Sequence, residues 1–77
     1  LNYIAKGVLI VAREDDGRMK MSIRSHHIEI SDIIADSIKG LDGYGGGHEL
    51  ACGASVSVKD FDEFLERFKK GVNQRKK

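Results

Sequence analysis

The run Gly43-Tyr44-Gly45-Gly46-Gly47-His48 limits the backbone of this chain more strongly than any other segment. Three consecutive glycines add to the entropy cost of folding, so a fold keeps them where the backbone needs positive φ or where a ligand approaches closer than a β-carbon allows. A phosphate suits such a segment best, because unhindered backbone N–H groups beside an imidazole can donate several hydrogen bonds to its oxygens. We therefore expect an anion-binding loop here.

Length and composition predict one small domain. A chain of 77 residues buries only about 60% of its unfolded surface. Its 40% hydrophobic and 32% charged residues, with no proline, are typical of α/β or α+β domains and not of disordered or membrane-spanning chains. No apolar run reaches transmembrane length and no signal-peptide pattern is present, so we expect a cytoplasmic protein with no membrane partner. The single cysteine, Cys52, fits a reducing compartment.

The formal net charge of +1 conceals two basic zones that contain no acidic residue. The first zone lies between Arg18 and Ile28, and the second follows Glu66 and ends in the segment 73–77. Such zones can bind polyanions. The alternative is a solvated surface, which is favoured for the second zone.

Two strands are expected in the first third of the chain. Val8–Ala12 is a short apolar run rich in β-branched residues, and Asp16-Gly17 after it is typical of a hairpin turn. Apolar and polar residues then alternate along 18–24, which predicts a strand with one face in the core and one cationic face that carries Arg24.

The remaining elements are two helices and a third strand. Ser31 can cap a helix that stops near Gly40, and the glycine run follows as a loop. Residues 51–58 alternate between apolar and very small side chains, which predicts a strand with one open face. Asp60 and Glu63 form a capping-box pattern before an amphipathic closing helix. The apolar stripe of that helix is Phe61, Phe64, Leu65, Phe68 and Val72.

These elements predict an α/β fold of the α+β type, in the order β-β-α-loop-β-α. The expected architecture is a small mixed β-sheet with helices packed on one face.

Ser22-Ile23-Arg24-Ser25, followed by a helix and then by Gly-Tyr-Gly-Gly-Gly-His-Glu-Leu-Ala-Cys-Gly-Ala, resembles the DHH-associated domain. This is the C-terminal substrate-binding domain of DHH-superfamily phosphoesterases, a superfamily that includes RecJ-like single-strand exonucleases and oligonucleotide phosphodiesterases. The resemblance covers residues 1–72, with 73–77 as a basic tail. Tyr44 and Cys52 depart from the family pattern, which has a small residue and an alanine at these positions.

The resemblance implies a division of labour between two domains. An upstream domain would carry the Asp-His-His motif and a manganese pair, and this domain would close over the substrate and be inactive alone. Leu1, where an initiator methionine would stand, also leads us to expect a piece of a longer polypeptide. No catalytic or metal-binding residue is expected here. The family's substrate-binding positions correspond to Arg24, Ser25, Gly45, Gly46, Gly47 and His48.

Several of these residues have structural alternatives. Arg24 could pair with Glu29 or Glu49, and His48 could brace its loop through backbone hydrogen bonds. The glycines could form a plain chain reversal. Tyr44 could stack on a nucleobase or serve in packing.

The function expected from the sequence is substrate binding in a metal-dependent phosphodiesterase or single-strand exonuclease. The partner would be single-stranded nucleic acid, a short oligonucleotide or a nucleotide phosphate. The alternative is an autonomous single-stranded nucleic-acid-binding module that works without an enzyme.

Overall fold

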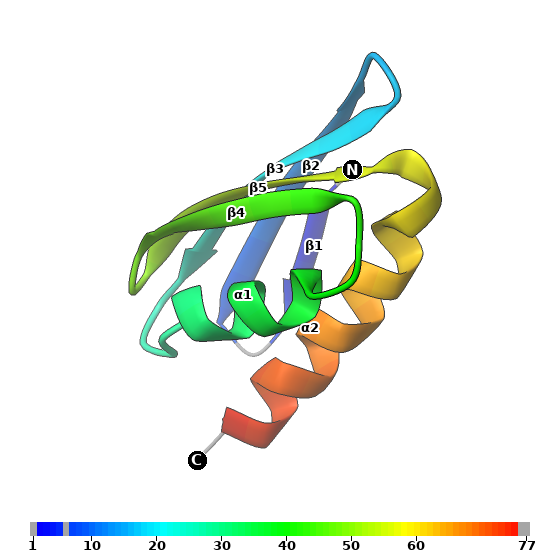
Figure 1. Cartoon of the computed structure of the whole chain (residues 1–77). Coiled ribbons are helices and arrows are strands. Elements are labelled where there is room, and N and C mark those ends of the chain that lie inside the picture. The colour runs from blue at the N-terminus through cyan, green and yellow to red at the C-terminus, as the bar shows by residue number, and fades with distance from the viewer. Residues whose placement is uncertain (1, 6, 76–77) are drawn as a thin grey trace.

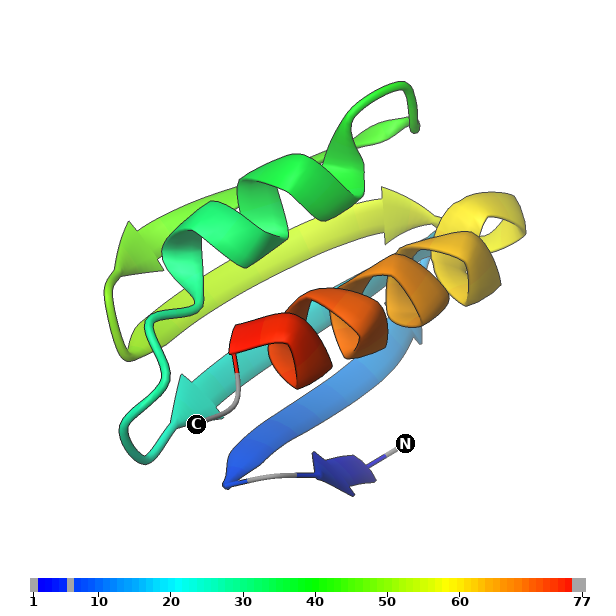
Figure 2. The same cartoon turned by 90° about the horizontal axis from the view of Figure 1, so that it is seen from below.

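Alternating apolar and polar residues build a five-stranded antiparallel sheet, and two amphipathic helices cover one of its faces (Figures 1 and 2). The structure, a computed structural model, describes residues 2–5 and 7–75. Across the sheet the strands follow the order β1-β2-β3-β5-β4, and each neighbouring pair is antiparallel. The elements are β1 (Asn2–Ala5), β2 (Val8–Asp15), β3 (Arg18–Ser25), α1 (Ser31–Ile38), β4 (Gly43–His48), β5 (Ala51–Ser57), the short 3-10 helix η1 (Val58–Asp60) and α2 (Phe61–Arg75).

The expected α+β class, with the helices on one face, is confirmed. The sheet is antiparallel in the described residues, however, and not mixed. It also contains β1, which is absent from the expected order because four residues carry too short a pattern to predict a strand.

The β2–β3 hairpin forms at the predicted turn. Asp16 and Gly17 have φ values of 56° and 79°, the left-handed conformations that a two-residue type I′ turn needs. The predicted alternation along β3 is also confirmed, because Met21 and Ile23 are buried and Arg24 is exposed.

The glycine run is a strand and not the expected loop. It forms β4, the edge strand, which pairs with β5 from Gly43 opposite Val56 to His48 opposite Ala51. Glycine usually weakens a strand. Here β4 lies so close to β5 that β-carbons at alternate positions would collide with it, and this close pairing accounts for the composition.

Helix α1 begins at Ser31, but Ser31 is not its cap. Ile30 occupies the N-cap position, and no side-chain hydrogen bond caps the helix. Ile30 is fully buried, and its N–H donates to the Glu49 carbonyl oxygen at 2.8 Å. Burial and this tertiary hydrogen bond therefore fix the start of the helix at Ile30 without a side-chain cap. At the other end Gly40, with φ 79°, follows the helix as the predicted stop.

Helix α2 carries the predicted apolar stripe and is longer than expected. It continues to Arg75, so residues 73–75 of the expected tail are helical, whereas 76–77 lie outside the described residues. Val58, expected on the third strand, lies in η1 and is 43% exposed, because β5 ends at Ser57. The Asp60 carboxylate accepts a hydrogen bond from the Asp42 backbone N–H at 2.9 Å.

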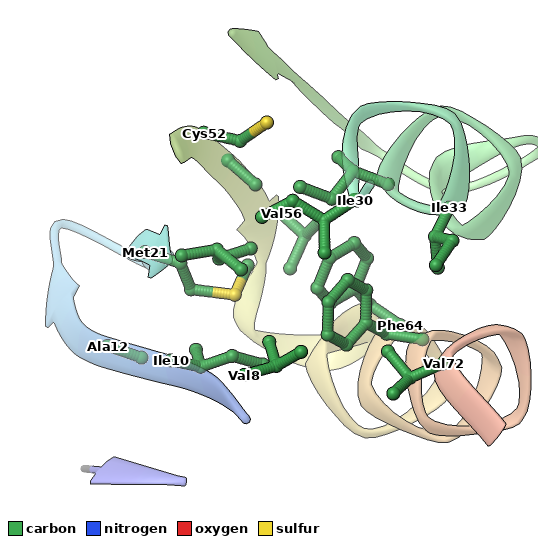
Figure 3. Close-up of a cluster of buried hydrophobic side chains, with 14 of the residues drawn as sticks. Val8, Ile10, Ala12, Met21, Ile30, Ile33, Cys52, Val56, Phe64 and Val72 are labelled. Carbon is green, nitrogen blue, oxygen red and sulfur yellow. The ribbon is translucent and has the colours of Figure 1, made fainter. Parts of the chain in front are cut away.

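The core fills the space between the helices and one face of the sheet (Figure 3). Phe64 and Phe68 of α2 stack at its centre, with ring centroids 6.0 Å apart. Among the described residues no helix covers the opposite face, which we call the outer face (Figure 2). Neither α1 nor α2, as far as the chain is described, has the length and apolar character needed to cross a membrane.

Removal of one methyl group should destabilise the fold at a core position but not at an exposed position. Ile34 is 0% exposed and Ile4 is 73% exposed. We expect Ile34→Val to lower the free energy of unfolding by about 0.5–1.5 kcal/mol, because it leaves a void in the core, and the matched control Ile4→Val to change it by less than about 0.5 kcal/mol. Urea unfolding measures both, and equal effects would contradict this placement of the core.

Candidate anion-binding face of the sheet

Arg24 and His48 lie on the outer face, in one row across three strands. Arg24 of β3 is paired with Ala51 of β5, and Ala51 is paired with His48 of β4. Directly opposed residues in an antiparallel pair point to the same face of the sheet. Because Ile23, next to Arg24, is fully buried on the core side, the row presents a guanidinium, a methyl group and an imidazole to the outer side.

The spacing of this row suits a single anion held by both ends. Adjacent strands are about 4.8 Å apart, which places the α-carbons of Arg24 and His48 roughly 10 Å apart. Both residues are exposed, and only the small Ala51 lies between them. A planar guanidinium can donate two parallel hydrogen bonds to an anion above Ala51, and an imidazole N–H can donate a third.

The other two cations on this side of β3 already have partners. Arg18 Nη1 lies 3.2 Å from Asp42 Oδ1, and Lys20 Nζ lies 3.0 Å from Asp15 Oδ2. The hydrogen bond from Lys20 lowers the pKa of the Asp15 carboxyl, because it favours the ionised form.

Arg24 forms no ion pair or side-chain hydrogen bond with any residue in the described part of the chain. The structural alternative, a pair with Glu29 or Glu49, is therefore not formed. The guanidinium of Arg24 is available to an incoming anion.

The glycines of β4 serve two different purposes. A β-carbon on Gly45 would lie 2.9 Å from Ala54 Cβ, and one on Gly47 would lie 2.6 Å from the Ala51 carbonyl oxygen. Gly47 also has φ 146°, which favours glycine. A β-carbon on Gly46 would meet nothing within 4 Å. Packing against β5 therefore explains Gly45 and Gly47 but gives no reason for Gly46.

Gly46 belongs to a second row on the outer face, next to the row of Arg24. It is paired with Gly53 of β5, which is paired with Ser22 of β3. Two adjacent strands thus have no side chain in this row, and a ligand can approach their backbone directly. Gly53 is not among the predicted site residues; only the small-residue alternation along 51–58 indicates it.

The loop between β3 and α1 holds the β4–β5 turn and so positions His48. The Ser25 N–H donates to the Leu50 carbonyl oxygen at 2.9 Å, and the Ile30 N–H donates to that of Glu49 at 2.8 Å. Both carbonyls belong to the turn directly after His48. The turn is therefore tied to the same segment of chain that follows Arg24.

Ser25 itself points away from the outer face. It is paired with the buried Val8, on the opposite side of the sheet from Arg24. Its hydroxyl accepts a hydrogen bond from the Ile28 N–H at 2.9 Å. Ser25 thus braces the loop that supports the site.

Cys52 links the two strands of the β4–β5 hairpin. Its Sγ donates to the His48 carbonyl oxygen at 2.9 Å, and the residue is 8% exposed. Burial raises the pKa of the Cys52 thiol, which favours the protonated form that donates this bond.

Among the depressions on the surface of the described chain are two of about 290 Å³ each. One lies between α1 and α2, on the helical side, and includes Arg67 and Lys70 in its lining. The other lies on the outer face between β2 and β3, and it reaches Ser22 at the end of the Gly46 row. The second depression thus adjoins the β3 end of the Gly46 row.

The described residues contain no group of three or more His, Cys, Asp or Glu side chains that could hold a metal ion. They do not fit the manganese pair expected of a complete phosphoesterase. In adjacent rows the outer face offers the Arg24 guanidinium, the His48 imidazole and bare backbone. Arg13 of β2, opposite Lys20, is a second exposed guanidinium on this face that forms no ion pair within the described residues.

The family model of the DHHA1 domain matches residues 1–74. The chain belongs to the DHHA1 domain family. DHHA1 domains are associated with DHH-superfamily phosphoesterases, which depend on metal ions. In these proteins a DHHA1 domain is associated with a DHH catalytic domain. The predicted family resemblance is thereby confirmed. No curated protein matches the chain.

The DHHA1 domain brings together half of the predicted substrate-binding residues. Arg24, Gly46 and His48 share the outer face. Ser25, Gly45 and Gly47 belong to the opposite side, where they shape the loop and strand that carry the others. Contact of these residues with a substrate remains a prediction.

Two alanine substitutions should separate the two kinds of glycine in the DHHA1 domain. We expect Gly45→Ala to lower the free energy of unfolding by about 1–3 kcal/mol, because the new β-carbon collides with the backbone and side chain of β5. Gly46→Ala has open space and should be neutral or slightly stabilising. Urea unfolding measures both, and a Gly46→Ala domain as unstable as Gly45→Ala would show that Gly46 is also a packing glycine.

The Cys52 thiol should make stability depend on alkaline pH. Its folded-state pKa is raised, so its contribution is complete below the unfolded-state pKa of about 8.5 and is lost as pH rises through the folded value. The difference in unfolding free energy between the natural domain and Cys52→Ala should therefore be smaller at about pH 10 than at about pH 7. A difference that does not change with pH would rule out this role for the thiol.

Proposed function

We propose that this DHHA1 domain binds the phosphate backbone of single-stranded nucleic acid or a short oligonucleotide. In this proposal it is the substrate-binding domain of a metal-dependent DHH-superfamily phosphodiesterase or single-strand exonuclease. Arg24 and His48 hold one phosphate between them, and the side-chain-free row at Gly46 lets the strand lie close to the backbone.

The observation that carries this proposal is the state of Arg24. It is the one cation of β3 on the outer face with no acidic partner in the described chain, and it shares a row with His48 across the small Ala51. An exposed, unpaired guanidinium beside an imidazole has the donor geometry for a phosphate. Family membership supports a phosphoester ligand over other anions.

The domain's own contribution to catalysis is positioning. In phosphodiester hydrolysis, metal ions activate water and stabilise the developing charge. That chemistry belongs to a DHH catalytic domain, because the described residues here do not form a metal site. Arg24 and His48 anchor a phosphate of the substrate, so that the scissile phosphate is aligned with the attacking water.

Binding by the 77-residue chain tests this site. Arg24→Ala should weaken binding of a fluorescent single-stranded oligonucleotide about 10-fold, because a hydrogen bond to a charged group is worth about 1.5 kcal/mol or more. It should also reduce the slope of log affinity against log salt by about 0.7, the value for one phosphate contact on a single strand. Fluorescence anisotropy at several salt concentrations measures both.

The control is Lys70→Ala, which removes the same charge from the exposed surface of α2 on the helical side. It should leave affinity and slope nearly unchanged. Equal losses of affinity in the two variants would contradict a specific site and would indicate a general attraction of the oligonucleotide to positive charge.

Kinetics of the complete enzyme give a second test. Arg24→Ala should raise KM more than it lowers kcat, because a phosphate anchor away from the reacting bond binds ground state and transition state alike. Steady-state kinetics on an oligonucleotide measure this ratio. Unchanged constants would exclude Arg24 from the site.

The salt titration also distinguishes the autonomous nucleic-acid-binding module. A module of that kind should retain the oligonucleotide near physiological salt and show a steep slope from several released counterions. A half-site that needs a catalytic domain should bind weakly under the same conditions. Tight binding by the 77-residue chain would therefore favour the autonomous module.

A further inference from the structure

Tyr44 is an exposed aromatic residue on the outer face of β4, at a position where packing does not require one. It is 68% exposed. It is paired with Ser55 of β5, which is paired with Lys20 of β3, so all three lie on the same face as Arg24 and His48. An aromatic ring on a glycine-rich edge strand gains little from burial and therefore needs another explanation.

The ring of Tyr44 is held in place by Arg18. The guanidinium carbon of Arg18 lies 5.6 Å from the ring centroid, a cation–π contact. Arg18 Nε donates to Ser55 Oγ at 2.9 Å, its Nη2 donates to the Ser55 carbonyl oxygen at 3.1 Å, and its Nη1 pairs with Asp42. Ser55 is 4% exposed, so the guanidinium is anchored to a rigid part of the sheet. Tyr44 is thus a fixed ring with most of its surface open to solvent.

Tyr44 and His48 lie on one face of β4, four residues apart, with Gly46 between them. This spacing places their α-carbons about 13 Å apart. Between them lies the row of Gly46 and Gly53, where no side chain would block a nucleic-acid strand that crosses this surface. We therefore expect a ligand that contacts both side chains to be longer than a mononucleotide.

We propose that Tyr44, held by Arg18, is a stacking platform for a second nucleobase of the substrate. This inference rests on the proposed function, because it needs a phosphate of the same strand at Arg24 and His48. Aromatic rings bind bases of any sequence through their π-faces, and a cationic guanidinium next to the ring adds to this attraction. The platform makes the domain select oligonucleotides over mononucleotides, without preference for base sequence.

The row of Tyr44 also contains a cation, Lys20, that could bind the next phosphate of the same nucleic-acid strand. Lys20 lies across Ser55 from Tyr44 and is paired only with the exposed Asp15. Exposed ion pairs of this kind are weak and can be exchanged for a phosphate partner. Between β3 and β4, the Arg24–His48 row and the Lys20–Tyr44 row therefore each offer one cation and one ring, and Arg13 of β2 adds a cation next to Lys20.

Three probes separate base stacking from phosphate binding: thymidine 5′-monophosphate, tetrathymidylate, and a tetranucleotide backbone without bases. Tyr44→Leu should weaken tetrathymidylate binding to the 77-residue chain by about 5-fold to 150-fold, the range for one stacked base. It should leave the monophosphate and the base-free backbone unaffected. Tyr44→Phe, which keeps the ring, should bind all three probes like the natural chain. NMR titration measures these affinities even where they are weak.

Tyrosine fluorescence reports the contact directly. The chain has two tyrosines and no tryptophan, so Tyr3→Phe makes Tyr44 the single emitter. Tetrathymidylate should quench this emission with the dissociation constant found by NMR, and the base-free backbone should not.

The outcomes distinguish the two proposals. If Arg24→Ala does not change the binding of any probe, the proposed phosphate site is wrong and the platform fails with it. If Arg24→Ala weakens binding but Tyr44→Leu does not, the platform alone is overturned. Equal weakening of tetrathymidylate and the base-free backbone by Tyr44→Leu would also overturn it, because the effect would then come through Arg18 and charge.

Discussion

The pairing of β5 with β3 is the constraint on which the rest of the structure depends. It opposes Ala51 to Arg24, and the β4–β5 hairpin then places His48 in the same row. Because side chains alternate between the faces of a strand, a shift of one residue in this pairing would turn Tyr44 and His48 toward the helices. Burial of the core side of β5 and the hydrogen bonds from the β3–α1 loop to the β4–β5 turn prevent such a shift.

Local patterns were sufficient to predict most of the fold. The Asp16-Gly17 turn, the alternation along β3 and the stripe of α2 each depend on a few neighbouring residues, and each is confirmed. The errors arose where tertiary contacts outweighed a local preference. Ile30, and not Ser31, occupies the N-cap position of α1 because its burial and its bond to Glu49 fix it there. The glycine run is a strand because β5 lies against it.

The candidate site was predictable in its residues but not in its geometry. Sequence motifs identified Arg24, Gly46 and His48, yet only the pairing register shows that they share one face. The same register separates Ser25, which follows Arg24 directly, from the site. The alternation along 51–58 indicates that Gly53 lies on a face of small residues, but its place beside Ser22 follows only from the pairing of β3 with β5. The Arg18–Tyr44 contact joins two distant segments, and no pattern within a single segment could have revealed it.

The row of Arg24, Ala51 and His48 joins segments that are distant in the sequence, and this affects when the site can form during folding. The β2–β3 and β4–β5 hairpins are local and can close early, but β3 meets β5 only after the chain has travelled through α1 and β4. Pairings between distant segments carry a larger loop-closure entropy and form more slowly. An intermediate that contains only the two hairpins has Arg24 on one and His48 on the other, with no fixed separation. Assembly of the row therefore requires the long-range pairing of β3 with β5, and an arrangement that has only the two hairpins lacks it.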